Sequence, residues 1–110
     1  HGTSTKLNDR IETRAIKNVF GDHAYKLAVS STKGNTGHMI AATGAVEGII
    51  TALSVYNDYI PATLNYRVPE EECDLDIVPN NGREAKVDYA LSNSLGFGGH
   101  NACIILNKVK

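Results

Sequence analysis

With 110 residues, the chain is long enough for a single domain and no more. Hydrophobic residues make up 42% of it and charged residues 21%, the composition of an ordinary soluble globular domain. The net charge is −1 and the eleven Lys and Arg residues are scattered. The sequence therefore offers no basic patch for nucleic acid or for an anionic membrane.

The two cysteines do not form a known metal-binding or redox motif. Cys73 and Cys103 stand thirty residues apart, with no CxxC motif and no histidine at metal-ligand spacing. We therefore expect no metal site and a reducing compartment. Cys103 lies in an apolar run, which favours a small buried residue. Because the sequence starts at His1 without an initiator methionine, we expect a piece of a longer protein, in which a targeting peptide could not be seen.

The first predicted element is an amphipathic helix over residues 10–20, with apolar side chains at helical spacing. Asp9 is its expected N-cap, and Glu12 stands where the third helical residue of a capping box would be. Gly21 is expected to end the helix.

A short strand over residues 27–30 and a polar loop over residues 31–37 come next. Residues 39–56 then form a predicted helix that is apolar almost all the way round. Such a helix lies inside a protein or a membrane. Glu47 near its middle argues against a membrane span, so we expect a buried core helix and no membrane partner. Its several Ala and Gly residues would let neighbouring backbones approach closely.

The last part of the chain is predicted to be rich in strands. In order, it contains an extended segment, an acidic loop, a turn and two strands: residues 60–65, 69–76, 80–82, 88–95 and 101–109. A wholly buried helix needs a layer on each side, and this chain by itself hardly supplies both.

Glu47 is the first candidate for chemistry, because an ionised carboxylate on an apolar helix is costly to bury unless it is paired. Lys33 lies in the polar run just before that helix and is its natural partner. An exposed helix position, or a position facing a segment outside this chain, explains Glu47 equally well. The residues alone leave both explanations open.

His38 is expected at or near the start of the same helix, where Thr36 could provide the cap. The positive end of a helix disfavours a protonated imidazole, so we expect a neutral ring that can donate one hydrogen bond to a carbonyl oxygen. A histidine satisfied within the core is the alternative. Lys33 and Gly37 close by favour the functional interpretation.

Two further segments carry residues that could take part in chemistry. Residues 1–5, His-Gly-Thr-Ser-Thr, could present polar groups to a cleft, although a plain turn leading into a helix has the same composition. Residues 93–99, Asn-Ser-Leu-Gly-Phe-Gly-Gly, place a ring between glycines that let backbone N–H groups approach a ligand. Their spacing does not fit a dinucleotide-binding loop and no helix follows. A simple hairpin turn is the alternative.

Taken together, these segments resemble one family, the β-ketoacyl-acyl carrier protein synthases, and most closely those that elongate chains in type II fatty-acid synthesis. The resemblance rests on three motifs in the right order: HGTST followed by Asn8, Asp9 and Glu12; the STKxxTGH run before an Ala/Gly-rich helix; and NSxGFGGxN. It implies an α/β, thiolase-like layered αβαβα fold, with residues 1–110 as its C-terminal half and the N-terminal half absent.

The family resemblance also implies a reaction. A cysteine of the N-terminal half takes an acyl chain from acyl carrier protein and condenses it with malonyl held on a second carrier, giving 3-oxoacyl-acyl carrier protein. His1 and His38 match the two family histidines, which stabilise the enolate formed as carbon dioxide leaves. Aimed hydrogen-bond donors suit that developing charge. The chain would be part of an acyltransferase, inactive alone because the nucleophile lies outside it.

Other site residues follow from the same resemblance. Lys33 matches a family lysine and Glu47 its carboxylate partner, and we expect Lys33 to orient His38 rather than to touch substrate. Thr3 and Thr5 match positions that hydrogen-bond the phosphopantetheine arm.

The gate and the acidic positions complete the implied site. Phe97 matches the gating ring, whose backbone N–H completes an oxyanion hole. The glycines at the gate are Gly96, Gly98 and Gly99. Two acidic residues match positions near the lysine, with a structural or cation-binding role: Asp9 and Glu12.

The resemblance implies partners and leaves alternatives. The expected partners are acyl carrier protein carrying acyl and malonyl groups, the missing N-terminal half and a second copy in a homodimer. No cofactor is expected, because phosphopantetheine arrives on the carrier protein. Two residues depart from the family pattern: Lys6 replaces the usual Pro at a position expected near the surface, and Leu95 replaces the commoner Phe, which would alter packing behind the gate. His100 resembles plastid-type members, so the expected location is the cytoplasm or a plastid. A polyketide-type ketosynthase and a non-catalytic chain-length factor are the alternatives.

Overall fold

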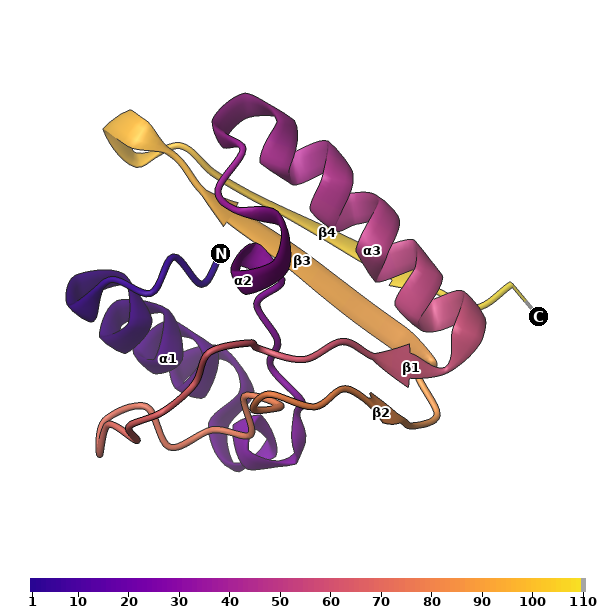
Figure 1. The fold of residues 1–110 in the computed structure, drawn as a ribbon, viewed down its shortest axis with the longest axis horizontal. Helices are drawn as coiled ribbons and strands as arrows, with labels where there is room; N and C mark the ends of the chain where they lie inside the picture. The colour runs from indigo at the N-terminus through magenta and orange to yellow at the C-terminus, as the bar shows by residue number, and fades with distance from the viewer. Residues whose placement is uncertain (110) are drawn as a thin grey trace.

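The computed structural model describes residues 1–109 (Figure 1). Helices and short 3-10 turns (η) come first along the chain, and four strands follow, with one further turn between the last two: α1 (Lys6–Phe20), η1 (Gly21–Lys26), α2 (Lys33–Thr36), η2 (Ile40–Ala42), α3 (Thr43–Asn57), β1 (Tyr59–Ile60), β2 (Arg83–Glu84), β3 (Tyr89–Leu95), η3 (Phe97–Gly99) and β4 (Asn101–Asn107).

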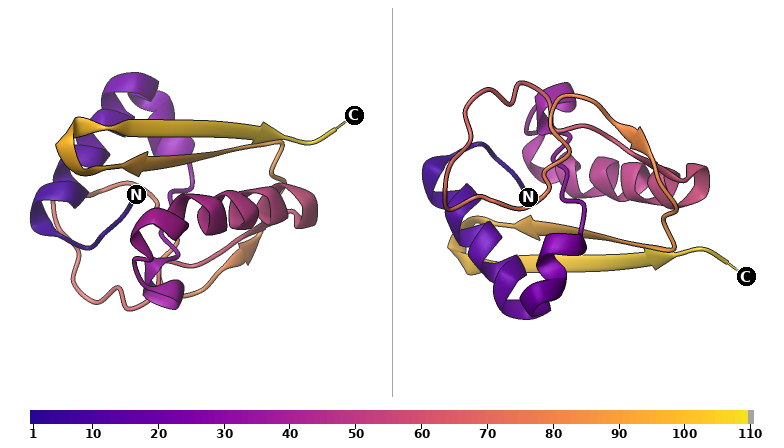
Figure 2. Two further views of the ribbon diagram at one scale, coloured as in Figure 1. Left: turned by 90° about the horizontal axis from the view of Figure 1, so that it is seen from above. Right: turned by 90° about the horizontal axis from the view of Figure 1, so that it is seen from below.

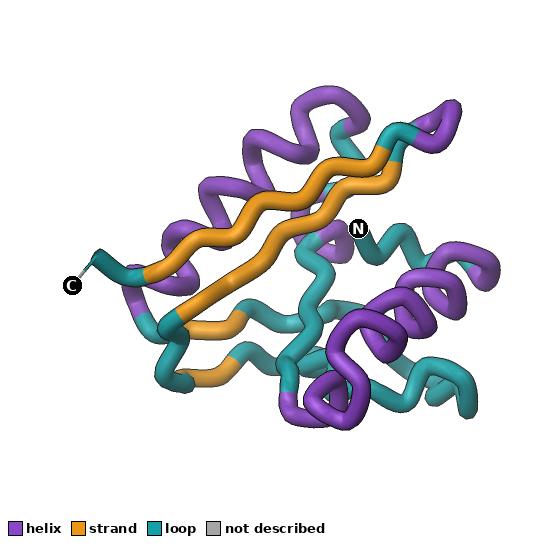
Figure 3. The backbone as a smooth tube through the Cα atoms, turned by 180° about the vertical axis from the view of Figure 1, so that it is seen from behind, coloured by secondary structure: helices purple, strands orange, loops and turns teal. Residues whose placement is uncertain are grey.

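α3 lies between two antiparallel strand pairs (Figure 2). β3 and β4 form a hairpin in which Asn93 faces Cys103, and β1 pairs with β2 through Tyr59 opposite Glu84. η1 and the end of α1 lie on the other side of the hairpin from α3, which the view from behind also shows (Figure 3). Helices and strands therefore alternate in layers, as expected for a layered α/β fold.

α3 approaches the hairpin closely because a glycine occupies the contact. A Cβ added at Gly48 would lie 3.4 Å from Ile104 Cδ1, which is already tight. This contact is with a side chain of the hairpin, so the predicted close approach of neighbouring backbones to the helix stays a prediction.

The hydrophobic core within this chain is small. Its buried apolar side chains are Ala24, Val55, Leu75 and Val78. α3, which we expected to be wholly buried, exposes Ile49, Leu53 and Tyr56, and Cys103 is also exposed. Both expectations are wrong for the described residues, because a pair of two-stranded sheets is too narrow to cover a helix that is apolar on every side.

The start of α1 differs from the prediction. The helix begins at Lys6 rather than at residue 10, and Thr5 is its N-cap, with Oγ1 accepting a hydrogen bond from the backbone N–H of Asn8 (3.3 Å). Asp9 lies in the first turn, where its negative charge is favourable. The predicted capping box is therefore wrong, because the helix starts four residues earlier, with Thr5 as its cap.

Other boundaries also shift. Gly21, with φ 54°, ends α1 as predicted. Residues 27–30 form only one parallel bridge, from Ala28 to Asp76, instead of a strand. The predicted loop 31–37 contains α2. The two C-terminal strands are confirmed within two residues at each end.

The segment Ile40–Asn57 has the length and mean hydropathy of a membrane-crossing helix, 18 residues with a value of 1.2. The core helix of a soluble protein has the same properties. Here the segment is divided into η2 and α3, and Glu47 in its middle is ion-paired with Lys33. Its contacts with the hairpin and with β1 are those of a layer in a folded domain.

Candidate active site

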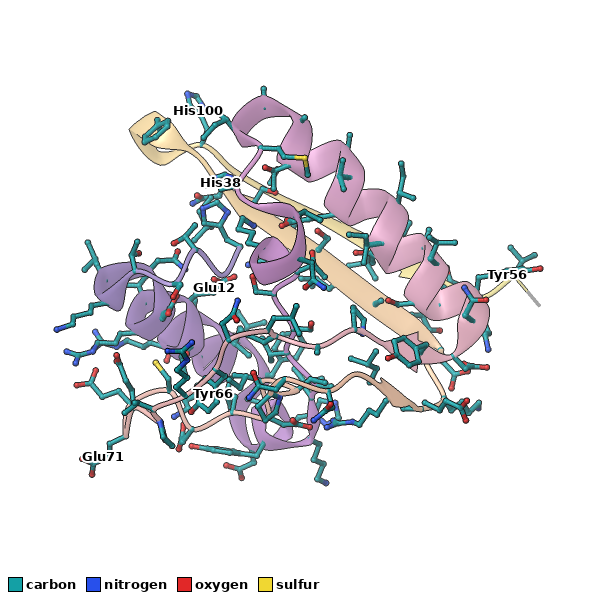
Figure 4. The ribbon with its side chains drawn as sticks, viewed as in Figure 1. Glu12, His38, Tyr56, Tyr66, Glu71 and His100 are labelled. Atoms are coloured by element: carbon teal, nitrogen blue, oxygen red, sulfur yellow. The ribbon has the colours of Figure 1, made fainter. Side chains whose placement is uncertain are left out.

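The two histidines singled out from the sequence lie side by side. The ring centroids of His1 and His38 are 5.3 Å apart and the ring planes are inclined by 85°, an edge-to-face arrangement. Figure 4 shows His38 beside the N-terminal loop, near Glu12. His1 Nδ1 is buried without a hydrogen-bond partner among residues 1–109. The structure thus brings together two imidazoles that come from separate segments.

His38 is held through one ring nitrogen. Its Nδ1 accepts a hydrogen bond from the Ile40 N–H (3.3 Å) and lies 3.1 Å from Thr43 Oγ1. Because Nδ1 accepts, the proton of the neutral ring is on Nε2. Nε2–H is then the group that remains free to donate to a ligand oxygen.

The expected environment of His38 is only partly correct. His38 precedes η2 and is not in the first turn of α3, whose N-cap is Ala42. Thr36 does not cap that helix, because its hydroxyl donates to the carbonyl oxygens of Thr32 (3.3 Å) and Gly37 (3.0 Å). The orientation of the ring therefore comes from hydrogen bonds to Nδ1 rather than from a capped helix end.

Lys33 and Glu47 form the predicted ion pair. Lys33 Nζ lies 2.5 Å from Glu47 Oε1, and the two side chains are 7% and 12% exposed. Lys33 Nζ also donates to the carbonyl oxygen of His1. Lys33 therefore positions the backbone of His1, and no direct hydrogen bond within residues 1–109 joins it to His38, the residue that we expected it to orient.

Glu12 fixes the N-terminal loop from the other side. It is 8% exposed and accepts hydrogen bonds from the main-chain nitrogens of His1 (2.6 Å) and Gly2 (2.8 Å). The side-chain amides of Asn8 (3.1 Å) and Asn93 (2.8 Å) donate to the same carboxylate. Glu12 thus joins the loop, α1 and β3, and these contacts fit the structural one of the two roles considered for it.

These contacts also set the ionisation of Glu12. In the 110-residue chain, where the main-chain nitrogen of His1 is a charged amino group, burial raises the pKa of the Glu12 carboxyl, but the hydrogen bond and positive charge of that amino group lower it by more. The hydrogen bonds from Gly2 and Asn8 act in the same direction. The net pKa lies below the ordinary value of a glutamate, so the carboxylate is ionised when it holds the loop.

Gly2 allows the N-terminal loop to lie against the run of residues 31–38. Its φ is +55°, and an added Cβ would be 2.5 Å from Ser31 Cβ. Ser31 Oγ donates to the carbonyl oxygen of Gly2 (2.7 Å). Ser31 thus holds the carbonyl group of Gly2, and Lys33 holds that of His1, so both residues are fixed against the run of residues 31–38.

The two threonines of the loop remain accessible. Thr3 Oγ1 and Thr5 Oγ1 are 3.2 Å apart in an exposed hydrogen bond, and Thr5 also caps α1. Residues 1–5 thus lead into a helix and also carry accessible polar side chains, so both interpretations of this segment apply. Their role with a phosphopantetheine arm stays a prediction.

Phe97 lies apart from the histidine pair. It occupies the tip of the hairpin, 90% exposed, in a turn with Gly98 at φ 77° and Gly99 at φ 82°. The Gly96 N–H donates to the His100 carbonyl oxygen (2.6 Å) and closes this turn. The tip and the start of α3 lie at the same end of the molecule (Figure 1). No hydrogen bond within residues 1–109 joins Phe97 to a histidine, and its gating role stays a prediction.

Sequence reasoning missed two contributors to this site. Asn93 is the donor from β3 to Glu12, and Thr43 contacts His38 from the start of α3. A buried carboxylate requires donors, so Asn93 could have been proposed as a partner of Glu12. Nothing in the local pattern indicated Thr43.

Two hollows of the surface lie at the other end of α3, one lined by Leu53 and Tyr59 and the other by Tyr56 and Leu106. Neither contains a histidine. In the part of the chain that the structure describes, no three His, Cys, Asp or Glu side chains are grouped to hold a metal ion.

Known proteins share these features. Residues 1–67 match the family described as Beta-ketoacyl synthase, C-terminal domain. The chain is 56% identical over 109 residues to 3-oxoacyl-[acyl-carrier-protein] synthase 2 of Coxiella burnetii, covering 99% of this chain and 26% of that protein. It is 52% identical over 108 residues to the protein of the same name from Synechocystis sp., covering 98% and 26%. The chain therefore spans about a quarter of the length of these relatives.

Solved structures with the same fold are ketosynthases. One is a type II PKS acyl-carrier protein in complex with its ketosynthase, with a TM-score of 0.97 and 39% identity, covering 100% of this chain and 27% of that one. Another is the ishigamide ketosynthase/chain length factor, with a TM-score of 0.94, 38% identity and coverage of 100% and 27%. The thiolase-like fold class expected from the sequence is thereby confirmed.

Proposed function

Because this chain belongs to the β-ketoacyl synthase family, we propose that it forms the decarboxylation side of the active site of a 3-oxoacyl-[acyl-carrier-protein] synthase. The reaction is the condensation of an acyl-enzyme with malonyl-acyl carrier protein in fatty-acid chain elongation. Curated relatives that bear this name are 52% and 56% identical, whereas the polyketide-type structures are 38% and 39% identical. This difference favours fatty-acid elongation over polyketide synthesis.

The observation that carries the proposal is the pairing of His1 with His38. When malonyl thioester loses carbon dioxide, the electrons of the broken C–C bond move to the thioester oxygen and form an enolate. The Nε2–H of His38 is free to donate to that oxygen, and His1 lies beside it with ring centroids 5.3 Å apart. Donors aimed at a developing oxyanion lower the barrier to its formation.

The framework around the pair keeps it ready for this task. Glu12 holds the main-chain nitrogen of His1, and Lys33 holds its carbonyl oxygen. Because both ends of the His1 backbone are fixed before substrate binds, little reorganisation is needed during the reaction.

Condensation also needs an acyl group on an enzyme thiol, which acts as the nucleophile in the preceding acyl transfer. The enolate carbon attacks the acyl thioester, a C–C bond forms and the thiolate leaves. Neither cysteine of this chain lies at the histidine pair: Cys73 is in the acidic loop and Cys103 is on β4. The proposal therefore places the nucleophile in residues outside this chain, and the isolated 110-residue chain is expected to show no condensation.

The proposal extends to partners and location. Acyl carrier protein delivers acyl and malonyl groups on its phosphopantetheine arm, so no separate cofactor is required. A similar ketosynthase has been solved in complex with its acyl-carrier protein. A homodimer is the proposed assembly, and the cytoplasm or a plastid is the proposed location.

Separate assays of the two half-reactions test the proposal in the full-length protein that carries this chain. His1→Ala and His38→Ala should each lower malonyl decarboxylation by about 10²-fold or more, the effect of losing one oxyanion donor. Acyl transfer from carrier protein to enzyme should change little. His23→Ala, on an exposed histidine of η1, is the matched control.

Two outcomes would count against the assignment. Equal loss of both half-reactions in the histidine variants would show that the histidines do not serve decarboxylation. Absence of acyl transfer in the full-length wild type would favour a non-catalytic partner, an alternative suggested by the 38% identity to a ketosynthase/chain length factor.

A further inference from the structure

We infer that Thr63 is a positioning residue that acts on the N-terminal loop through Ser31, an inference that rests on the proposed decarboxylation. Thr63 follows β1 in the chain and is half-buried. Its Oγ1 accepts a hydrogen bond from the backbone N–H of Ser31 (3.0 Å). A backbone N–H can only donate, so the direction of this bond is fixed. The Thr63 hydroxyl oxygen therefore holds the main chain of Ser31.

Ser31 passes this position on to the loop. Its Oγ donates to the carbonyl oxygen of Gly2 (2.7 Å), which can only accept. The N–H bound by Thr63 and the Oγ that binds Gly2 belong to one residue, so a shift of the Ser31 backbone also moves its hydroxyl. Because Gly2 is bonded directly to His1, Thr63 lies two hydrogen bonds from the backbone that carries this imidazole.

Thr63 can serve as a fixed point because its own backbone is bonded on both sides. Its N–H donates to the carbonyl oxygen of Val78 (2.9 Å), and its carbonyl oxygen accepts from the N–H of Asn80 (2.8 Å). Val78 is 1% exposed and belongs to the hydrophobic core. A β-branched side chain also has few χ1 rotamers. The oxygen that faces Ser31 therefore has little freedom to turn away.

Two neighbouring contacts join the same two segments, and the chain that leaves β1 runs past α2 (Figure 1). Ser30 Oγ donates to the carbonyl oxygen of Pro61 (2.6 Å). A Cβ added at Gly34 would lie 3.1 Å from Leu64 Cβ, closer than side chains normally pack. The hydrogen bond of Thr63 lies between these two contacts in sequence, and it is the one that binds the residue holding the N-terminal loop.

The consequence for the reaction concerns the position of the His1 ring. Without the Thr63 oxygen, the Ser31 N–H loses its acceptor, and leaving a buried donor unpaired is costly. The segment therefore moves toward a new acceptor and loosens its hold on Gly2. A small displacement of a donor weakens its stabilisation of the enolate. Acyl transfer to the enzyme thiol forms no enolate and should be spared.

The experiment compares variants of the full-length protein that carries this chain. Thr63→Val removes the acceptor at nearly constant volume, and Thr63→Ser keeps it. Thr51→Val is the matched control, since the Thr51 hydroxyl donates to the carbonyl oxygen of Glu47 within α3 (2.7 Å). The readouts are decarboxylation of malonyl-carrier protein, acyl transfer, and hydrogen–deuterium exchange of the segment that contains Ser31.

The expected result is a selective loss of decarboxylation. Thr63→Val should lower its rate about three- to tenfold, the factor corresponding to one neutral hydrogen bond, while acyl transfer changes little. Exchange around Ser31 should become faster. Thr63→Ser and Thr51→Val should match the wild type in all three readouts. If Thr63→Val does not fold, Thr63→Ala removes the same oxygen and serves in its place.

A double variant tests whether Thr63 acts through Ser31. Ser31→Ala removes the donor to Gly2 and should itself slow decarboxylation. Adding Thr63→Val should then slow it by a clearly smaller factor than in the wild type, because two residues of one network are not additive. Full additivity would overturn the inference.

Three other outcomes would overturn it as well: a Thr63→Val variant with wild-type rate and exchange, a Thr63→Ser variant that behaves like Thr63→Val, or equal loss of both half-reactions. Failure of the inference is distinguishable from failure of the proposed function. A wild-type protein that does not decarboxylate malonyl thioester contradicts the function, while the exchange around Ser31 still shows whether Thr63 holds this segment.

Discussion

Lys33 and Glu47 form a 2.5 Å ion pair whose side chains are 7% and 12% exposed. The pair joins α2 to α3, and the same Lys33 ammonium donates to the carbonyl oxygen of His1. A buried charge is tolerated when its partner and its hydrogen bonds are in place, and it becomes costly when one member is removed. The stability of the domain and the position of His1 therefore depend on the same two side chains.

Glu47→Gln should lower the free energy of unfolding by about 3–5 kcal/mol, because it leaves the Lys33 charge buried without a counter-charge. Urea unfolding of the full-length protein measures this loss. Lys86→Ala is the control, since the Lys86–Asp88 pair is 78% and 53% exposed and should change stability by about 0–1 kcal/mol. The double variant Lys33→Met, Glu47→Leu should recover most of the stability, and equal losses in Glu47→Gln and Lys86→Ala would contradict the expectation.

Gly2→Ala should destabilise the protein by about 1–3 kcal/mol and impair decarboxylation, because its Cβ would collide with Ser31 at a backbone position where φ is +55°. Gly21→Ala provides the comparison, since Gly21 has φ +54° but no atom within 4 Å of an added Cβ. The difference between the two variants in thermal unfolding isolates the collision from the backbone strain. Identical effects would show that Ser31 moves aside freely.

Glu12→Gln should weaken the protein most near neutral pH. A carboxyl whose pKa is lowered on folding stabilises the fold above its unfolded pKa, and that contribution is lost as the pH falls through the folded pKa. In the 110-residue chain, whose His1 amino group is charged, the pKa of Glu12 is lowered in this way. The deficit of the variant, about 1–3 kcal/mol at pH 7, should therefore shrink in urea unfolding series of the 110-residue chain taken down to about pH 3.

The control for this series is Glu71→Gln. Glu71 projects from the acidic loop, far from Glu12 (Figure 4). Its substitution should give a small difference from the wild type at every pH. A Glu12→Gln deficit that grows toward acid would have the wrong sign for a carboxylate stabilised by donors.

Phe97→Ala should separate activity from stability. The ring is 90% exposed, so the free energy of unfolding should change by no more than about 0.5 kcal/mol. Condensation should nevertheless fall if the ring acts as the gate of the site. Tyr89→Ala, on an exposed aromatic at the opposite end of the hairpin, should leave condensation unchanged. Equal condensation rates for the two variants would show that the Phe97 ring is not a gate.

Local patterns predicted the main elements of the fold. Apolar periodicity indicated α1 and α3, and two apolar runs around a glycine-rich turn indicated the β3–β4 hairpin. The start of α1 was missed because Thr5 and Asp9 are both good N-caps, and local sequence does not choose between them. The expected burial of α3 was wrong because burial depends on neighbouring layers, which a helical pattern does not contain.

The site was predictable only where burial or a motif constrained it. The cost of burying a charge pointed from Glu47 to Lys33, which lie fourteen positions apart. The role of Lys33 toward His1 was missed, since nothing in the sequence indicates that the N-terminal loop returns to α2. Likewise, the donation from Asn93 to Glu12 joins residues 81 positions apart, and nothing in the local sequence indicates that they meet.

The hydrogen bond between Asn93 and Glu12 closes a span of 81 residues, and this separation bears on how the molecule folds. A hairpin such as β3–β4 forms within microseconds from neighbouring residues, whereas distant contacts must first overcome the entropy of closing a long loop. We therefore expect Glu12 and Asn93 to meet only after these local elements exist. A partly folded chain with an intact hairpin and intact helices but without this contact would lack one of the donors to Glu12, the side chain that binds the main-chain nitrogen of His1.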